Sequence, residues 1–270
     1  MIGMSSTGSS LRLSGIEFQG VCNEILCNCR YAWLLYDFAS GAEHSGFFED
    51  DQPHKLIILG DLFDRGEEAL KIQAFVLEMM EKDQIILIKG NHEDLFEALV
   101  IEDHGKPYRH HVLNGTYDTA LQLTGYDPTM AGIRTFDFAD AAKRPPYSRQ
   151  IIPSMLDSFE TEHYVFVHGR IPCIYEHGQY NYYTGWRHAG PSGWAQARWV
   201  NGMDAAQACM EGKTIVCGHW HASYGHTKYE QKGSEFGPDA VFSPFYGSGI
   251  IALDACTAHS GMINVIVLED

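Results

Sequence analysis

Four short apolar runs dominate the pattern of hydrophobic and polar positions in this chain, and a polar cluster containing glycine follows each of them. The runs lie at residues 56–59, 85–88, 164–167 and 214–217. A run of this length is typical of a buried strand and is too short for a buried helix. We therefore predict four strands, each of which ends in a polar loop.

The segments after the first two runs have a helical pattern. Residues 67–80 carry apolar side chains three or four positions apart, which predicts a helix, and a second helix is predicted over residues 93–100. Strands that alternate with helices form parallel βαβ units, whose active sites lie at the carboxyl ends of the strands. Residues 249–253 and 262–268 are predicted to form a closing hairpin.

Two stretches between the predicted strands, residues 104–150 and 175–192, are rich in Tyr, His and Gly and have no clear periodicity. Such long irregular stretches in a compact domain are usually functional lids or small inserted subdomains. We therefore predict a single domain over residues 46–270 with lid-like insertions at these two places. Residues 1–45 are predicted to be an irregular N-terminal segment.

Composition narrows the class of protein. Apolar residues make up 45% of the 270 residues, which is enough for a sizeable core, and the formal net charge is −16. Such an acidic chain repels nucleic acid and anionic lipid, so we expect neither as a partner. No apolar run is long enough to span a membrane, and no signal peptide is visible. Seven cysteines without regular spacing indicate free thiols and a reducing compartment, so a cytoplasmic location is predicted.

The polar clusters after the four runs carry carboxylate, amide and imidazole groups. They read Gly-Asp-Leu-Phe-Asp-Arg-Gly at 60–66, Gly-Asn-His-Glu at 90–93, His-Gly at 168–169 and Gly-His-Trp-His at 218–221. Mixed oxygen and nitrogen ligands suit divalent metals such as Mn, Fe or Zn. The sequence therefore predicts a metal site at the strand ends.

These motifs, in this order, resemble the signature of the calcineurin-like metallophosphoesterase superfamily. Asp-Arg-Gly at 64–66 and the Glu after Asn-His at 91–92 are similar to bacterial relatives of the protein serine/threonine phosphatases. The resemblance extends from about residue 50 to the C-terminus. It implies a four-layer α/β/β/α sandwich, in which two sheets pack between helices, and a site with two divalent metal ions.

The resemblance also implies a set of metal ligands. Asp61 would bridge the two metals, and Asn91, His168 and His219 would complete one of them. His221 would bind the other.

Four further residues would act on the substrate. His92 would protonate the leaving oxygen, oriented by Asp64, and Arg65 would hold the phosphate. A second arginine is expected on the phosphate, for which Arg198 is the first candidate and Arg170 the second. Arginine suits this role because its planar fork can donate two hydrogen bonds to one phosphate.

Simpler interpretations exist for several of these side chains. Outside such a motif, Asp64 and Arg65 would be read as a surface ion pair, and His92 as a helix-end histidine satisfied by the backbone. The remaining histidines are predicted to lie on surface loops, namely His110, His111, His177 and His226. The tryptophans are predicted to serve in packing rather than substrate stacking, namely Trp186, Trp194 and Trp199.

One family motif is missing. The family opens with Asp-x-His-Gly after a first strand, whereas no Asp-x-His precedes Asp61 here, so the metal expected at His221 lacks two ligands. Reading the codons of residues 29–34 one nucleotide forward permits Ala-Asp-Met-His-Gly. We therefore hypothesise that the segment before about residue 46 is read out of frame, which the nucleotide sequence tests. In the chain as it stands, a central strand is expected to be lost, leaving an exposed sheet edge.

The implied reaction is hydrolysis of a phosphomonoester by a metal-bound hydroxide. Phosphoserine or phosphothreonine in a protein is the leading substrate, on the Asp-Arg-Gly and Asn-His-Glu motifs. A dinucleoside polyphosphate or another small nucleotide is the enzymatic alternative. The missing Asp-x-His favours a third interpretation, a catalytically impaired relative that binds a metal or a phosphate without turnover.

Overall fold

The structure is a computed structural model that describes residues 24–27, 47–48, 54–127, 135–205 and 212–269. Its strands are β1 (Glu24–Cys27), β2 (Leu56–Ile58), β3 (Ile85–Leu87), β4 (Phe159–Glu160), β5 (Tyr164–Phe166), β6 (Cys173–Glu176), β7 (Gln179–Tyr182), β8 (Thr214–Cys217), β9 (Phe245–Gly247), β10 (Ile250–Ala252) and β11 (Asn264–Val267). Its α-helices are α2 (Ala69–Glu81), α3 (Asn91–Glu97), α4 (Arg109–Leu113), α5 (Thr116–Thr124), α6 (Thr135–Ala142), α7 (Ile152–Ser154), α8 (Gly190–Ala197), α9 (Ala222–Glu230) and α10 (Thr257–Ser260). Short π-helical turns η2 (Ala98–Glu102) and η3 (Tyr147–Ile151) and a 3-10 turn η4 (Trp186–His188) join them.

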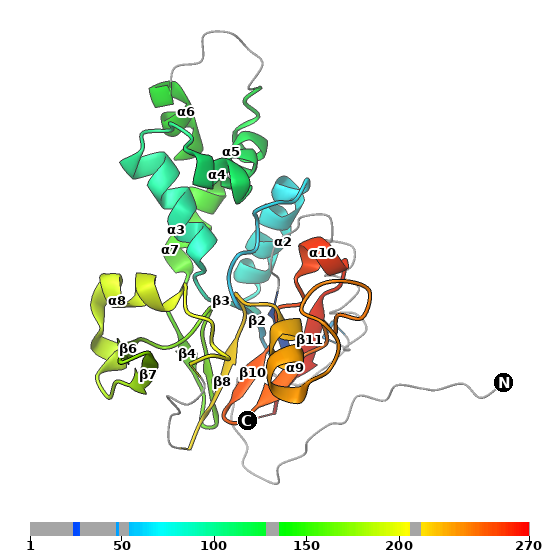
Figure 1. The fold of residues 1–270 in the computed structure, drawn as a ribbon. Helices are drawn as coiled ribbons and strands as arrows, with labels where there is room; N and C mark the ends of the chain where they lie inside the picture. Colours follow the sequence, from blue (N-terminus) through cyan, green and yellow to red (C-terminus); the bar gives the residue numbers. More distant parts are fainter. Residues whose placement is uncertain (1–23, 28–46, 49–53, 128–134, 206–211, 270) are drawn as a thin grey trace, which may run out of the picture.

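Most of these strands form two mixed sheets (Figure 1). The first has the order β11-β1-β2-β3, in which β1, β2 and β3 are parallel and β11 is antiparallel to β1. The second has the order β4-β5-β8-β10-β9, in which β5, β8 and β10 are parallel and the two edge strands are antiparallel. Helix α2 connects β2 to β3, so the predicted parallel βαβ unit is confirmed.

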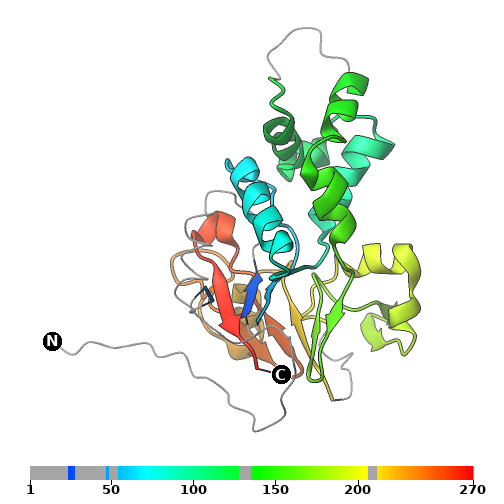
Figure 2. The same ribbon diagram turned by 180° about the vertical axis from the view of Figure 1, so that it is seen from behind.

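Alternate side chains of a strand point to opposite faces of its sheet, and the buried clusters show what covers each face. Ile57, Phe166 and Val216 belong to the cluster between the two sheets. Ile58, the next residue of β2, packs instead in a cluster with α2. Ile215, the neighbour of Val216 on β8, packs in a third cluster with side chains of α8 and α9. Helix, sheet, sheet and helix therefore form four layers, which confirms the predicted sandwich (Figure 2).

The predicted strands and both predicted helices are present, with ends that differ by a few residues. The predicted closing hairpin is wrong. β10 pairs with β9 and β8 in the second sheet, whereas β11 pairs with β1 in the first. The two segments therefore lie in different layers. A strand satisfies its backbone hydrogen bonds at the sheet edge that lies beside it, which need not be its neighbour in sequence.

The predicted loss of a central strand is also wrong. β1 lies between β11 and β2, where Ile25 pairs with Ile266 on one side and Ile57 on the other. Its four residues satisfy the backbone groups that would otherwise form an open edge of β2. The rest of the irregular segment predicted at residues 1–45 lies outside the described residues.

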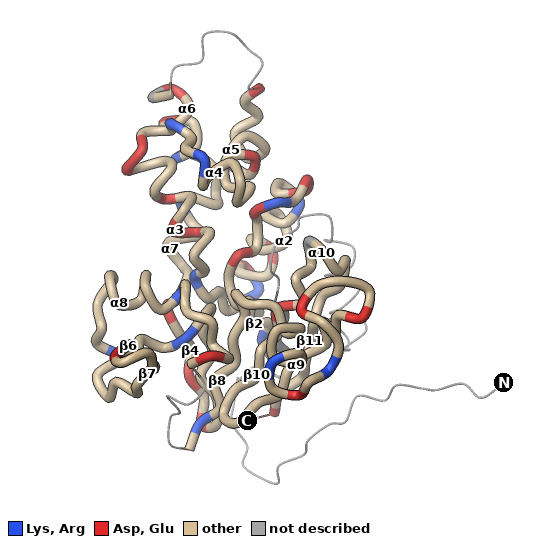
Figure 3. Tube along the Cα trace, in the orientation of Figure 1, with Lys and Arg blue, Asp and Glu red and all other residues tan. Residues whose placement is uncertain are grey.

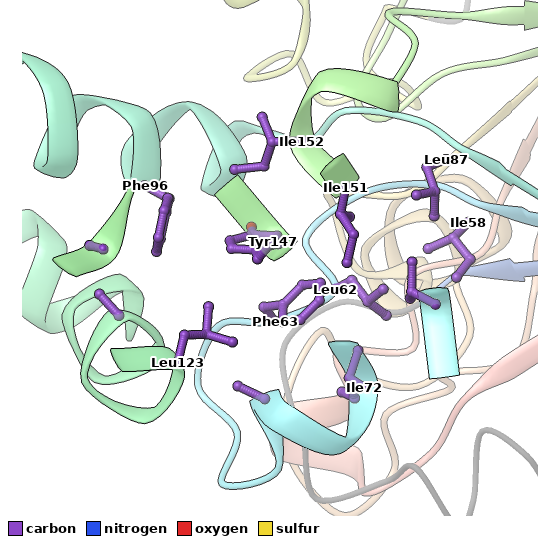
Figure 4. Close-up of a cluster of buried hydrophobic side chains, with 14 of the residues drawn as sticks. Ile58, Leu62, Phe63, Ile72, Leu87, Phe96, Leu123, Tyr147, Ile151 and Ile152 are labelled. Atoms are coloured by element: carbon purple, nitrogen blue, oxygen red, sulfur yellow. The ribbon is translucent and has the colours of Figure 1, made fainter. Parts of the chain in front are cut away.

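The stretch predicted as a lid-like insertion at 104–150 is helical. We define the helical insert as the described residues from η2 to α7, 98–127 and 135–154. Its helices are too short to show a clear period in the sequence. They project from the sheets in Figure 1, yet the inner end of the insert packs on the core beside α2. Figure 4 shows Tyr147, Ile151 and Leu123 of the insert against Phe63 and Ile72.

The second predicted insertion, at 175–192, contains a small two-stranded sheet. We define the hairpin segment as β6, β7 and η4, residues 173–188. Lys and Arg positions are interspersed among Asp and Glu along the described chain (Figure 3). No helix among the described residues is long and apolar enough to cross a membrane.

Candidate metal centre and catalytic site

The four polar clusters follow β2, β3, β5 and β8, and their side chains meet between the two sheets' carboxyl ends. His168 Nε2 lies 3.3 Å from Asp61 Oδ2 and 2.8 Å from Asn91 Oδ1. His219 Nδ1 lies 2.9 Å from the same Asn91 oxygen. All four side chains are buried. The fold therefore brings together four of the five predicted metal ligands.

These four residues fit a divalent metal ion. Ligand atoms of Asp61, His168 and His219 all lie within 4.8 Å of one another. His168 Nδ1 donates to the carbonyl oxygen of Leu59 at 2.5 Å, which leaves the lone pair of Nε2 facing Asp61 and Asn91. Asp61 Oδ2 is buried and has no hydrogen-bond donor among the described residues. A cation would satisfy that oxygen, and the mixed donor set is one that Mn, Fe and Zn accept.

Two glycines let the loops approach one another this closely. A Cβ atom on Gly60 would lie 2.7 Å from Gly90 Cα, and a Cβ atom on Gly90 would lie 2.2 Å from Asp61 Oδ1. Asp61 and His219 themselves have positive φ angles, 55° and 64°. Such angles are uncommon outside glycine and concentrate at functional sites, where the surrounding structure holds them.

His92 and Asp64 form a buried pair beside this centre. His92 Nδ1 lies 2.7 Å from Asp64 Oδ2, and His92 Nε2 lies 3.8 Å from Asp61 Oδ2. Asp64 also accepts hydrogen bonds from Thr116 Oγ1 at 2.5 Å and Thr119 Oγ1 at 2.7 Å, both on α5. Asp64 thus holds His92 with the proton on Nδ1 and with Nε2 facing the centre, and α5 holds Asp64. The interpretation of Asp64 as part of a surface ion pair does not fit this burial.

The charges of the site act on one another. Burial opposes the charge of Asp61, but the imidazoles of His168 and His92 outweigh it and hold the pKa of Asp61 far below its usual range. Burial lowers the pKa of His92, but the charge of Asp61 and the hydrogen bond to Asp64 outweigh it and raise that pKa above the ordinary value. His92 therefore retains a proton more readily than a free histidine, as a general acid requires.

Glu93 is a site residue to which the sequence analysis assigned no role. Its Oε2 accepts hydrogen bonds from the backbone N–H groups of Asp61 at 3.1 Å and Gly90 at 2.8 Å. The hydroxyl of Tyr147, on η3, donates to Oε1 at 3.3 Å. Burial, followed by the charge of Asp61, raises the pKa of Glu93. Glu93 ties together the loops after β2 and β3. Its position directly after Asn91-His92 is the sequence feature that could have identified it as a site residue.

The predicted phosphate-binding arginines are both engaged by side chains. Arg65 Nη2 donates to Asn114 Oδ1 at 2.7 Å. Arg198 is buried, with Nε and Nη2 on the two oxygens of Asp94 at 2.6 and 3.0 Å and Nη1 on Asp157 at 2.6 Å. Arg170, the other candidate, is buried two residues after His168.

His221 is the predicted ligand that the structure does not place in the group of Asp61, His168 and His219. Its Nε2 lies 2.7 Å from Glu235 Oε1, a residue of the loop after α9. His221 therefore lies outside this group and has a carboxylate partner, Glu235, that the sequence did not predict.

Two further expectations need correction. Of the histidines predicted on surface loops, His111 and His226 are buried on α4 and α9, where hydrogen bonds satisfy their rings. His110 is exposed but also lies on α4, and His177 is exposed in the turn between β6 and β7.

Of the three tryptophans predicted to serve in packing, Trp186 and Trp194 are buried as predicted. Trp199 is 52% exposed and contacts the ring of His219, so it is not part of the buried core.

A family model for calcineurin-like phosphoesterases matches residues 41–253 of the chain. The chain belongs to this family. The match covers all the predicted site residues and places the chain among metal-dependent phosphoesterases, in agreement with the resemblance of the motifs. No curated protein matches the chain significantly.

Solved structures similar to this chain include a phosphatase, a putative diadenosine tetraphosphatase and a metallophosphoesterase. A protein serine/threonine phosphatase from Saccharomyces cerevisiae, similar to human PP5, is 15% identical over 74% of this chain and 64% of that one, with a TM-score of 0.37. A putative diadenosine tetraphosphatase is 11% identical over 94% of this chain and 100% of that one (TM-score 0.40). A metallophosphoesterase from Sphaerobacter thermophilus is 14% identical over 73% of this chain and 60% of that one (TM-score 0.30). The chain thus spans less than two thirds of the yeast and Sphaerobacter proteins.

Proposed function

We propose that this protein is a metal-dependent phosphoester hydrolase. The observation that carries the proposal is the convergence of Asp61, Asn91, His168 and His219 from four strand ends, with His92 Nε2 only 3.8 Å from Asp61 Oδ2. A metal-binding group next to a histidine that is oriented by a carboxylate is the arrangement that hydrolysis of a phosphoester needs.

We assign the metal centre to Asp61, Asn91, His168 and His219, with His221 as the outer ligand of a second ion. Bound there, divalent ions such as Mn, Fe or Zn would lower the pKa of an attacking water and neutralise charge on the phosphoryl oxygens. The buried bonds of Glu93 to the backbone of Asp61 and Gly90 hold the loops in place for such ions.

His92 donates its Nε2 proton to the leaving oxygen in this proposal. Asp64 keeps the Nδ1 proton in place and stabilises the charged form of the ring, so that the imidazole presents Nε2–H to the substrate. After the leaving group departs, His92 is neutral and regains a proton from solvent for the next cycle.

Arg65 and Arg198 are proposed to bind the phosphate. Arg65 has a positive φ of 67° and lies directly after Asp64. Arg198 donates to Asp94 through Nε and Nη2, so a phosphate bound by these two groups would replace that carboxylate as their partner. Arg170 is the alternative second arginine, because it lies close in sequence to His168 and is buried at the site's end of β5.

The sequence favours one substrate class, and the structure favours another. The Asp-Arg-Gly and Asn-His-Glu motifs favour a phosphoserine or phosphothreonine protein, acted on in the cytoplasm. A specific structural observation, the exposed indole of Trp199 next to His219, favours a nucleotide such as a dinucleoside polyphosphate. The third interpretation, a metal-binding relative without turnover, rests on the missing Asp-x-His motif.

The test is hydrolysis of a generic aryl phosphate with and without Mn(II), with His92→Ala as the matched variant. We expect turnover that requires Mn(II) and falls by a factor of about 10² to 10⁴ in His92→Ala. A version with the reading frame of the N-terminal segment corrected serves as a second comparison. Turnover only in the corrected version would show that this chain is impaired, and turnover in neither would refute the hydrolase proposal for generic monoesters.

A further inference from the structure

The turn between α4 and α5, in the helical insert, lies against two consecutive residues of the loop after β2. Thr116 Oγ1 donates to Asp64 Oδ2 at 2.5 Å, and Asn114 Oδ1 accepts a hydrogen bond from Arg65 Nη2 at 2.7 Å. Gly115 lies between these two contacts, and a Cβ atom on it would be 2.5 Å from the backbone nitrogen of Arg65. Three consecutive residues of the insert therefore contact the Asp64-Arg65 pair in register.

The backbone on both sides of this contact has an unusual conformation. Arg65 has a φ angle of 67°, and Gly115 has a φ angle of 84°. An arginine rarely adopts a positive φ angle, and it keeps one only where the surrounding structure holds it. Gly115 can approach Arg65 so closely because it has no side chain. The turn therefore helps to hold the backbone of Arg65 as well as its side chain.

The amide group of Asn114 is fixed at both ends. Its Nδ2 donates to the carbonyl oxygen of His110, one helical turn earlier on α4, at 2.8 Å. The backbone N–H of Asn114 donates to the same oxygen at 3.0 Å. Because the NH₂ group faces a carbonyl oxygen, the amide presents its Oδ1 to Arg65. The acceptor for the guanidinium is thus oriented by α4.

The contact orients the guanidinium of Arg65 without neutralising it. Asn114 is uncharged, whereas Arg198, the other arginine proposed at the phosphate, donates to the carboxylates of Asp94 and Asp157. A guanidinium has five N–H donors in one plane, so a single bond to Asn114 uses one donor and restricts the plane. A partner that selects one arginine rotamer in advance lowers the entropic cost of binding an anion.

We propose that Asn114 is a positioning residue that holds the guanidinium of Arg65 in the orientation in which it binds the substrate phosphate. This inference rests on the proposed phosphoester hydrolysis, and in it Asn114 acts through Arg65 without touching the substrate. Thr116 supports Asp64 from the same turn. The insert therefore orients both the phosphate-binding arginine and the carboxylate that holds His92.

The first test is steady-state hydrolysis of an aryl phosphate by the full chain with Mn(II). We expect Asn114→Ala to raise KM by about 5- to 20-fold, the size of one hydrogen bond to a charged group, with kcat within about twofold of wild type. Asn181→Ala, which removes an exposed amide on β7, is the matched control and should equal wild type. An equal loss of kcat at unchanged KM would overturn the proposal, because Asn114 would then not act on phosphate binding.

A double-mutant cycle tests whether Asn114 acts through Arg65. Calorimetric titration with inorganic phosphate in the presence of Mn(II) is done on wild type, Asn114→Ala, Arg65→Ala and the double variant. We expect Asn114→Ala to weaken phosphate binding by about 5- to 20-fold in wild type and to have no further effect in the Arg65→Ala background. Asn114→Ser, whose side chain is too short to reach Arg65, replaces Asn114→Ala with the same expectation if the latter does not fold.

The phosphate titration also separates this inference from the proposed function. The expected cycle in a chain without turnover would support the positioning role while refuting the hydrolase. Turnover with the same phosphate affinity in wild type and Asn114→Ala would refute the positioning role and leave the hydrolase standing. Equal weakening in both backgrounds, or no phosphate binding by wild type, would each overturn the positioning role.

Discussion

The helical insert and the hairpin segment look alike in sequence, both rich in Tyr, His and Gly, but they are attached to the site in different ways. The helical insert sends Thr116 and Thr119 to Asp64 and Tyr147 to Glu93. All of these groups are buried. The insert therefore supports the buried pair of His92 and Asp64 rather than covering it as a loop.

The hairpin segment is attached mainly at the surface. Arg187 forms a two-pronged ion pair with Glu160 of β4, with Nε–Oε1 at 2.6 Å and Nη2–Oε2 at 2.5 Å, and both side chains are partly exposed. Tyr175 is 62% exposed and the other tyrosines of the segment are partly covered, whereas Trp186 is fully buried. An inserted segment therefore becomes part of a site when it supplies buried partners to the side chains of that site, whatever its sequence pattern.

The largest expected effect is at Asp64, the carboxylate that joins the insert to His92. Asp64→Asn should lower kcat by a factor of about 10² to 10⁴, because the amide no longer holds the Nδ1 proton of His92 or stabilises the charged ring. Steady-state hydrolysis of an aryl phosphate with Mn(II) measures this, with circular dichroism to verify the fold. A kcat within threefold of wild type would show that the pair is structural.

A smaller effect is expected at the insert itself. Thr119→Val keeps the shape of the side chain but removes a hydrogen bond to a buried carboxylate, which should cost about 1 to 3 kcal/mol of unfolding free energy and lower kcat about tenfold. Thr119→Ser should restore both, because it keeps the hydroxyl. Urea unfolding and kinetics report the two quantities. If the Val variant equals wild type in both, the insert does not support Asp64.

The smallest effect is expected at the hairpin segment. The hydrogen bond from Arg187, followed by that from Lys213, holds the pKa of Glu160 below its ordinary value, although burial opposes this. A lowered folded-state pKa contributes stability above the unfolded pKa, and this contribution is lost as the pH falls through the folded value. Because the pair is partly exposed, Arg187→Ala should cost less than about 1 kcal/mol at neutral pH, fading in acid, with kcat unchanged. Thermal unfolding at several pH values checks this, and a large loss of kcat would contradict the comparison.

The alternation of apolar runs and polar clusters was sufficient to predict the strands that carry the site residues. The apolar runs before Asp61, Asn91, His168 and His219 are strands, because four-residue apolar stretches that end at glycine have few other ways to bury themselves. Parallel strands of one sheet bring their carboxyl ends to one side, so the approach of Asp61 to Asn91 and of His168 to His219 could be foreseen. The meeting of the two pairs depends on how the two sheets pack.

The contacts that hold the site could not be foreseen in this way. Asp64 and Thr119 are 55 residues apart, and no periodicity links them. The pairing of β11 with β1, the partner of His221 and the exposure of Trp199 likewise depend on which surfaces lie next to one another after the layers pack. Periodicity records how a segment meets its immediate surroundings, and it carries no information on which distant segment supplies them. For that reason the strands and the polar clusters at their ends could be predicted from the sequence, whereas the contacts that support Asp64 and the exposure of Trp199 depend on the packed fold.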